Sequence, residues 1–251
     1  MAQQSPLILM HGIGAGASMF ALLENALAGR VPTLAWNMPG YEDAPAEAPL
    51  TFERLADLII QTLDNQGIEK GDLFGHSIGG MIAQEVAARY PDRVRSLILS
   101  GTTSFFGSRD GSFQKAFLEA RLAPLDAGQT MPQLAEEFVP QLLGDDPNPE
   151  AGPRARTGLS GLPQATYRTA LKCLVTFNRR EELAAFSAPT LLIAGEKDTN
   201  APLKTMRKMA EVIPGAQLVE LAGVGHLAPL ERPEAVADAV AGFLNTLAGE
   251  G

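Results

Sequence analysis

The sequence is poor in cysteine, since Cys173 is the only one among 251 residues. A single thiol excludes a disulfide within the chain and a metal cluster held by several thiolates. No histidine occurs in a comparable motif beside Cys173, so we interpret it as a small core residue rather than a nucleophile. Cysteine chemistry therefore has no place in the expected reaction.

Histidine is almost as scarce, with three residues at positions 11, 76 and 226. Each lies in a different glycine-containing turn, and no H-x-x-x-H or H-E-x-x-H spacing is present. Such spacings place two imidazoles on one helix face to bind zinc, so their absence argues against a zinc hydrolase. We expect no bound metal and no other cofactor.

Basic residues are outnumbered, with 20 Lys and Arg against 29 Asp and Glu and a net charge of −9. This balance argues against binding to nucleic acid or to an anionic membrane surface. No apolar run approaches the roughly 20 residues that span a bilayer, and the first residues lack the positive charge that opens a signal sequence. We expect a soluble, cytoplasmic protein whose partner is a small-molecule substrate.

The most informative motif that is present is G-x-S-x-G at residues 75–79. A short apolar run precedes it, and residues at helical spacing follow it at once. At such a strand-to-helix turn the serine backbone is strained, and only small neighbours leave room for the turn and for a substrate. The context predicts that Ser77 is a nucleophile whose following backbone N–H faces an oxyanion.

Short apolar runs alternate with helical patterns along much of the chain. This alternation predicts an α/β fold with a parallel, doubly wound sheet, whose functional sites lie at the carboxyl ends of the strands. Thr51 is the expected N-cap of one of the intervening helices. The expected strands span 7–10, 31–36, 72–75, 94–100, 190–194 and 217–221.

One segment interrupts the alternation. Residues 103–187 contain no convincing strand, and helical patterns cover 113–122, 131–143 and 164–178, with glycines near 158–161 between the last two. We interpret this segment as a helical lid, or cap, inserted into a core formed by residues 1–102 and 188–251.

A nucleophilic serine needs a base, and the base needs a carboxylate that fixes its tautomer. Asp198 follows the expected strand that begins at Thr190, and His226 lies in the loop after the last expected strand. Glu196 is a rival for the acid, and Asp198 has the alternative role of capping a helix that begins near residue 201. The chain order serine, acid, histidine is that of one hydrolase class.

These motifs resemble those of the α/β-hydrolase superfamily over almost the whole chain: HGIG at 11–14, GHSIGG at 75–80, APTLLIAGEKD at 188–198 and GVGHLAPLERPEAV at 223–236. The resemblance implies an α/β-hydrolase fold. It also implies that Ser77 is the nucleophile, Asp198 the acid and His226 the base. The backbone N–H groups of Ile13 and Ile78 would form the oxyanion hole.

The remaining candidates near the site have less specific signals. We interpret His11 as a side chain that fixes its own turn, and His76 as structural or pocket-lining. Phe105 and Phe106 are candidates for the wall of an apolar pocket, although ordinary packing within the lid is the favoured interpretation for either one taken alone.

Two stretches depart from the family pattern. Many relatives have an aspartate and a G-x-G-x-S run where this chain has NMPGYEDA at 37–44. We expect a different loop shape here, one that allows the side chain of Tyr41 or Glu42 to reach the site. Only six residues precede Leu7, so we expect the family's N-terminal hairpin to be missing. That leaves about six mainly parallel strands and exposes the edge strand near 31–36, which makes a homodimer possible.

The expected reaction is hydrolysis of a small carboxylic ester or lactone through an acyl-enzyme. The lid pattern is most similar to that of 3-oxoadipate enol-lactonase-like proteins. One alternative is a carbon–carbon bond hydrolase acting on a meta-cleavage-type diketone, and another is a non-catalytic receptor for a small ligand on the same fold. The motifs specify the fold and the triad without specifying the substrate.

Overall fold

A single six-stranded sheet forms the centre of the computed structural model, which describes residues 5–249. The strand order is β2-β1-β3-β4-β5-β6, and every neighbouring pair is parallel. The prediction of about six parallel strands is therefore confirmed, and β2 lies at one edge of the sheet, as expected. The strands are β1 (Leu7–Met10), β2 (Thr33–Trp36), β3 (Gly71–His76), β4 (Val94–Ser100), β5 (Thr190–Gly195) and β6 (Gln217–Leu221).

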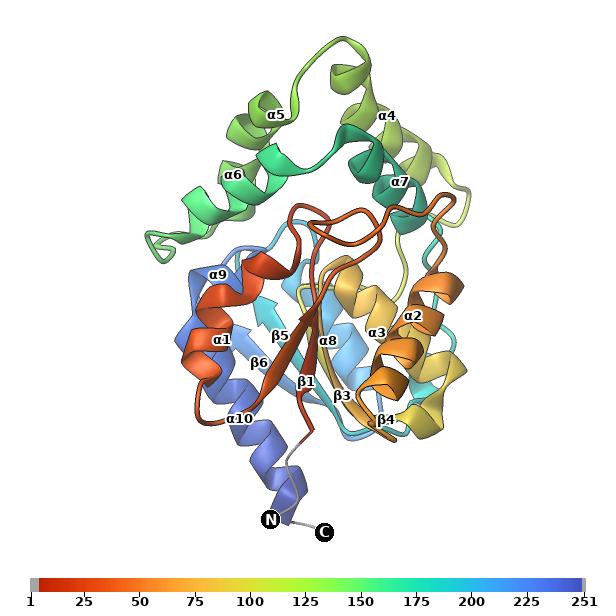
Figure 1. The fold of residues 1–251 in the computed structure, drawn as a ribbon, viewed down its shortest axis with the longest axis vertical. Coiled ribbons are helices and arrows are strands. Elements are labelled where there is room, and N and C mark those ends of the chain that lie inside the picture. Colours follow the sequence, from red (N-terminus) through yellow and green to blue (C-terminus); the bar gives the residue numbers. More distant parts are fainter. Residues whose placement is uncertain (1–4, 250–251) are drawn as a thin grey trace.

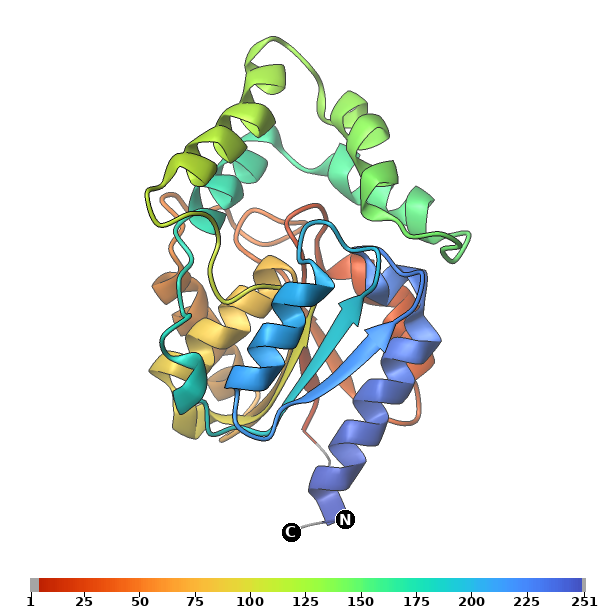
Figure 2. The ribbon, with the colours of Figure 1, turned by 180° about the vertical axis from the view of Figure 1, so that it is seen from behind.

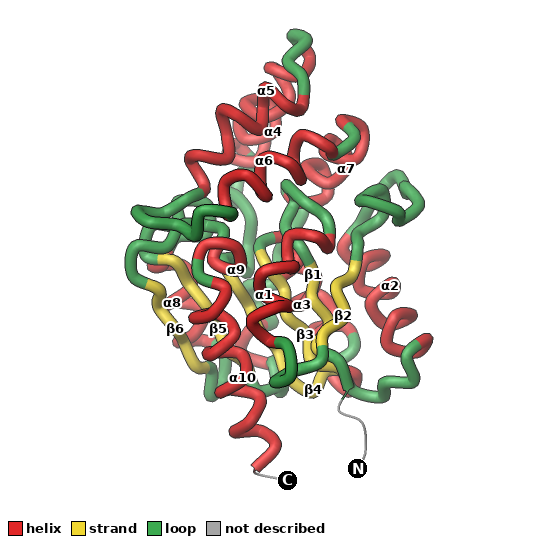
Figure 3. Tube along the Cα trace, turned by 60° about the vertical axis from the view of Figure 1, so that its left-hand side comes forward, coloured by secondary structure: helices red, strands yellow, loops and turns green. Residues whose placement is uncertain are grey.

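Helices cover both faces of this sheet (Figure 3). Within β1, Leu7 and Leu9 join one buried cluster with α1 and α10, whereas Ile8 and Met10 join the opposite cluster with α2 and α3. Successive strand residues point to opposite faces, so a strand covered on both sides has a continuous apolar run. The covering helices are α1 (Ala21–Leu27), α2 (Phe52–Asn65), α3 (Ile78–Arg89), α8 (Leu203–Val212), α9 (Ala228–Glu231) and α10 (Pro233–Gly249).

The helix α2 shows how the sequence specifies a covering helix. Thr51 is its N-cap and accepts the backbone N–H of Arg54 at 3.2 Å. Leu55, Ile59 and Leu63 recur at a spacing of four and are fully buried against the core. Burial of each such side chain contributes about 1.5–3 kcal/mol. No helix among the described residues combines the length and apolar character of a membrane span.

The helical segment between β4 and β5 lies above the carboxyl edge of the sheet (Figures 1 and 2). We call residues 103–187 the insertion. Its helices are α4 (Ser112–Asp126), α5 (Met131–Phe138), α6 (Ala151–Gly161) and α7 (Gln164–Leu174), with a short 3-10 helix at Val139–Leu142. The chain leaves the sheet after β4 and returns to it at β5, so the insertion covers the carboxyl ends of the strands.

The helix α6 was not predicted, because its glycines indicated a break. Gly158 lies inside it and faces the loop that follows β1. A Cβ atom on Gly158 would lie 2.8 Å from Cβ of Ala15, so the glycine permits a close approach between insertion and core. Tertiary packing has overridden the low helix propensity of glycine here.

Candidate active site

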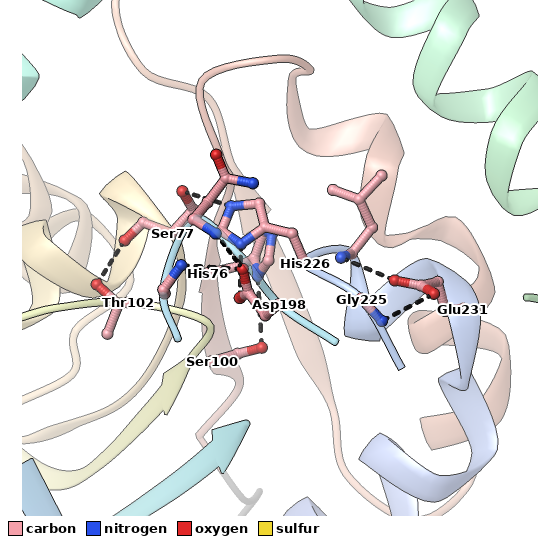
Figure 4. A network of polar contacts seen from close by, with 11 residues as sticks. His76, Ser77, Ser100, Thr102, Asp198, Gly225, His226 and Glu231 are labelled. Atoms are coloured by element: carbon pink, nitrogen blue, oxygen red, sulfur yellow. Dashed lines mark hydrogen bonds and ion pairs between the residues drawn. The ribbon is translucent and has the colours of Figure 1, made fainter. Parts of the chain in front are cut away.

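Ser77 occupies the turn between β3 and α3, with φ 55° and ψ −119°. A non-glycine residue in this region costs on the order of 1–3 kcal/mol, so the surroundings must hold it there. The Ser77 N–H donates to the carbonyl of Ser100 at 2.9 Å, and the Thr102 hydroxyl donates to the carbonyl of Ser77 at 2.8 Å. These bonds fix the turn (Figure 4), and Ser77 lies in the wall of a cavity between the insertion and the core.

The two glycines of the G-x-S-x-G motif are required by close backbone contacts. A Cβ atom on Gly75 would lie 2.2 Å from the carbonyl oxygen of Gly79. A Cβ atom on Gly79 would lie 2.0 Å from the carbonyl oxygen of Met10 at the end of β1. A side chain at Gly75 would force β3 and α3 apart, and one at Gly79 would force α3 away from the end of β1.

Three predicted side chains meet at the carboxyl edge of the sheet (Figure 4). Nε2 of His226 lies 3.1 Å from Oγ of Ser77, and Nδ1 of His226 lies 2.8 Å from Oδ2 of Asp198. Ser77 follows β3, Asp198 follows β5 and His226 follows β6, so parallel strands bring together residues far apart in sequence. In this geometry the imidazole can accept the hydroxyl proton while the carboxylate holds the imidazole in the required orientation.

Asp198 is not the cap of a helix near residue 201, because α8 begins at Leu203 without a side-chain cap, and Asp198 instead fixes its own loop. Its Oδ1 accepts the backbone N–H groups of Asn200 at 2.8 Å and Ala201 at 2.9 Å, while Oδ2 faces His226. Burial alone raises the pKa of Asp198, but the neighbouring His226 and the hydrogen bonds that the carboxylate accepts lower the pKa below its ordinary value. The carboxylate is therefore ionised at neutral pH. The rival acid Glu196 instead accepts the N–H of Gly223 at 2.8 Å.

The HGIG turn lies beside the serine. A Cβ atom on Gly12 would lie 3.5 Å from Cβ of Ser77, and Ile13 lines the same cavity. The Tyr41 hydroxyl donates to the carbonyl of Ile13 at 2.9 Å. Within residues 5–249, neither Ile13 N–H nor Ile78 N–H donates to a protein acceptor. Both N–H groups are thus available to a group bound at Ser77.

Loop 37–44 supports this turn from outside. Tyr41 is buried, and Glu42 accepts the backbone N–H of Ser18 at 3.0 Å. The Asn37 side chain accepts the N–H of Ala17 at 2.7 Å. The loop that departs from the family pattern therefore holds the segment after β1 in place.

The other two histidines are buried and neutral. His11 accepts the N–H of Met38 at its Nε2 (3.0 Å), and burial lowers its pKa to about 4. The His76 ring centroid lies 5.1 Å from that of His226. Burial and, to a smaller extent, His226 lower the pKa of His76 to about 3. Neither histidine adds a positive charge beside His226 at neutral pH.

A cavity of about 280 Å³ lies between the insertion and the core, and Ser77 and His226 are in its wall. Its lining is mainly apolar, which suits a small organic molecule with few polar groups. The structure brings two of the predicted lining residues, His76 and Phe106, to this cavity. Further lining residues from the insertion include Phe117, Arg121, Phe138, Leu142, Leu159 and Tyr167.

Phe105 differs from its predicted place, because it is not among the residues that line the cavity. Its backbone forms an isolated antiparallel bridge with Asn178, and the Arg180 guanidinium lies 4.5 Å from the centre of its ring. The bridge ties the start of the insertion to its end and turns Phe105 away, while the next residue, Phe106, faces the cavity. Adjacent aromatic residues in an extended segment point in opposite directions.

Glu231 is a residue that the sequence interpretation missed. Its buried carboxylate accepts three backbone N–H groups, those of Gly144 (2.7 Å), Gly225 (3.1 Å) and Leu227 (3.0 Å), as Figure 4 shows in part. Gly225 and Leu227 flank His226, so Glu231 fixes the loop that carries the imidazole. The available signal was an acidic residue five positions after His226 within an otherwise apolar stretch.

The insertion also contacts the histidine loop directly. The His226 N–H donates to the carbonyl of Leu142 at 2.7 Å, and the Asp145 N–H donates to the carbonyl of Gly223 at 2.8 Å. With the bond from Gly144 to Glu231, these contacts attach residues 142–145 of the insertion to residues 223–226. We call this the histidine-loop junction.

Comparison with known proteins places these features in a family. Two relatives match nearly all of this chain. Pimeloyl-acyl-carrier-protein methyl ester esterase of Chromobacterium violaceum is 29% identical, over 99% of this chain and 97% of the esterase. The second relative is the dihydrolipoyllysine-residue acetyltransferase component of the acetoin cleaving system of Pseudomonas putida. It is 28% identical over 96% of this chain, and the match covers 63% of that longer protein.

Two solved structures superpose closely on this one. A thermophilic esterase from Thermogutta terrifontis has a TM-score of 0.86 and 26% identity, with 96% of this chain and 90% of the esterase covered. The enol-lactonase from Burkholderia xenovorans has a TM-score of 0.84 and 24% identity, with 97% and 92% covered, and shares the fold. The family model described as the alpha/beta hydrolase family matches residues 7–239. The resemblance drawn from the four motifs is confirmed: this chain belongs to the alpha/beta hydrolase family.

Proposed function

We propose that this protein is a serine hydrolase that cleaves a small carboxylic ester or lactone through an acyl-enzyme. The observation that carries the proposal is the chain of contacts from Ser77 through His226 to Asp198 in the wall of an apolar cavity. The esterase of Chromobacterium violaceum, which matches this chain over nearly its whole length, supports the ester as substrate class.

In the proposed mechanism, Ser77 Oγ attacks the substrate carbonyl carbon while Nε2 of His226 takes the hydroxyl proton. The carbon–oxygen bond to the leaving group then breaks, and His226 gives its proton to the departing oxygen. Water attacks the acyl group on Ser77 in the second half, with His226 again accepting the proton. The bond from the acyl carbon to Ser77 Oγ then breaks, and His226 returns the proton to that oxygen as the acid is released. Ionised Asp198 stabilises the imidazolium in both halves and holds Nδ1 as the donor.

The backbone N–H groups of Ile13 and Ile78 are the proposed oxyanion hole. They belong to the HGIG turn and to the first turn of α3, on either side of Ser77. Loss of one such donor typically costs about 2.7–4 kcal/mol of transition-state stabilisation. A side-chain substitution cannot delete a backbone N–H donor. The oxyanion hole can therefore be tested by substituting the side chains that hold these backbone segments in position.

Tyr41→Phe is expected to lower kcat about fivefold with little change in KM. The substitution removes the hydroxyl that donates to the Ile13 carbonyl, and the net value of such a hydrogen bond is on the order of 1 kcal/mol. Steady-state kinetics on a p-nitrophenyl ester measures the effect. Tyr90→Phe is the matched control, because the Tyr90 hydroxyl donates to Asp57 instead. Equal losses in the two variants would contradict the role given to Tyr41.

Glu231→Gln is expected to lower both stability and kcat. An amide has one acceptor oxygen, so at least one N–H of Gly144, Gly225 or Leu227 would face an NH2 group. We expect a loss of about 1.5–3 kcal/mol in the free energy of unfolding, measured by urea denaturation, and a lower kcat. Glu234→Gln, at an exposed position nearby, should change neither. If Glu231→Gln had the stability and kcat of the wild type, Glu231 would not be the residue that fixes the His226 loop.

The experiment that tests the proposed function is a substrate panel run beside Ser77→Ala. It contains short p-nitrophenyl esters, small lactones and a meta-cleavage-type diketone. Turnover of esters or lactones above the Ser77→Ala background supports the proposal. A far larger kcat/KM for the diketone would favour a carbon–carbon bond hydrolase. If no substrate exceeds the background while a small ligand binds tightly, the protein is a receptor instead.

A further inference from the structure

Arg121 is unusual among the residues described as lining the cavity, because it is the one side chain there with a permanent charge. The other polar side chains of the lining are His76, His226, the amide of Asn200 and several hydroxyl groups. An isolated charge in an apolar wall is costly unless it is paired. Packing within the insertion does not explain why a charged side chain lies in this apolar wall.

The helix α4 carries Arg121 along the cavity. Phe113, Phe117 and Arg121 follow one another at intervals of four residues, so they lie on one face of the helix, and all three line the cavity. Phe113 is 53% exposed and marks the outer end of this row. Arg121 lies about 12 Å further along the helix axis, at 1.5 Å of rise per residue.

Two aromatic rings hold the Arg121 guanidinium. Its central carbon lies 3.7 Å from the centre of the Phe138 ring and 5.5 Å from that of Phe117. Stacking uses the flat faces of the guanidinium and leaves the N–H donors at its edge unused. Burial lowers the pKa of Arg121 from its ordinary value, yet arginine remains charged at neutral pH.

Several other arginines of the insertion are paired, and the two without an ion pair among the described residues, Arg109 and Arg180, do not line the cavity. Arg154 contacts Glu150 at 2.7 Å, Arg168 contacts Asp126 at 2.6 Å, and Arg179 contacts Glu85 at 2.7 Å. Across residues 5–249, no carboxylate forms an ion pair with Arg121, and no protein acceptor receives one of its N–H groups. Its charge and its donors are available to a ligand in the cavity.

We propose that Arg121 binds a carboxylate on the substrate, at the end of the molecule away from the bond that is cleaved. The proposal rests on the function proposed above and narrows its substrate class to esters or lactones that carry a second, anionic group. A carboxylate matches the fork of guanidinium N–H donors in a two-point contact, and apolar walls strengthen that contact by excluding water. The mainly apolar lining of the cavity suits a hydrocarbon linker between the two polar groups of such a substrate.

The test compares two esters of the same acid. Monomethyl esters of dicarboxylic acids, from succinate to suberate, have a free carboxylate, whereas the dimethyl esters have the same skeleton without it. We expect the wild type to prefer the best monomethyl ester. Arg121→Met should lower kcat/KM for that monoester by about 10–100-fold, the range given by one hydrogen-bonded ion pair, and leave the dimethyl ester unchanged. Arg121→Lys should restore part of the preference.

Arg168→Met is the matched control, since it removes a paired arginine from the same insertion. It should leave the ratio of the two kcat/KM values unchanged. If the ratio of kcat/KM for the monomethyl and dimethyl esters is the same in wild type and Arg121→Met, the proposal is overturned. Turnover of the dimethyl esters would in that case still support the hydrolase function.

If neither ester is hydrolysed, the hydrolase function fails and binding decides the role of Arg121. Calorimetric titration of the free dicarboxylic acids into wild type and Arg121→Met then provides the comparison. Binding that depends on Arg121 supports the carboxylate site. Absence of binding, or equal binding by both proteins, overturns it.

Discussion

Ser77→Ala should lower kcat for ester or lactone hydrolysis by about six orders of magnitude, to the background left by binding and the oxyanion hole. The reason is that the Ser77 hydroxyl is the group within hydrogen-bond distance of Nε2 of His226, 3.1 Å away. The alanine retains the Cβ atom and the positive φ of the turn, so the melting temperature should be nearly unchanged. Initial rates and a thermal melt measure the two effects.

A fluorophosphonate probe locates the nucleophile independently. It should label the wild type at Ser77 and leave Ser77→Ala unlabelled. Ser104→Ala, which replaces another buried serine near the end of β4, should behave as wild type in both rate and labelling. Retained turnover by Ser77→Ala, or labelling at a different residue, would show that the assignment of the nucleophile is wrong.

Asp198→Asn should lower kcat by about four orders of magnitude. The asparagine oxygen can still accept the N–H groups of Asn200 and Ala201, so the loop keeps its shape. Its NH2 group then faces Nδ1 of His226, which has to become an acceptor, and Nε2 becomes a donor that cannot take the Ser77 proton. The loss is one of chemistry rather than of structure, and kinetics combined with a thermal melt separates the two.

Glu196→Gln is the control for this second substitution. Glu196 is the other carboxylate of the same loop, and its side chain accepts the Gly223 N–H rather than facing His226. We expect a kcat within about threefold of wild type, since an exposed hydrogen bond contributes little. If Glu196→Gln were the crippling change and Asp198→Asn the mild one, the acid would have to be reassigned.

The sheet and the turn at Ser77 were predictable because their signals are local. Continuous apolar runs such as Leu7–Met10 identify strands covered on both faces, and Gly75 and Gly79 have no alternative at their close contacts. The meeting of Ser77, Asp198 and His226 followed from parallel strands, whose carboxyl ends share one edge of the sheet. The substrate-facing details of the insertion had no such local signal.

Three features of the insertion depended on tertiary contacts. The helix α6 forms despite Gly158 because that glycine lets it approach Ala15. Phe105 turns away because its backbone pairs with Asn178, seventy-three positions later in the sequence. Arg121 was not singled out among the arginines of the insertion because its distinguishing property is an unpaired position in the cavity wall, which no sequence pattern reports. Each required knowledge of what lies opposite in space.

The histidine-loop junction has a consequence for how heat inactivates this protein. Residues 142–145 contact the backbone on both sides of His226, and the His226 N–H itself donates to Leu142. Any fluctuation that detaches this corner of the insertion also releases the imidazole from its alignment with Ser77. We therefore expect the alignment of His226 and the attachment of this corner of the insertion to be lost together on heating, whereas the exposed Phe113 takes no part in this junction.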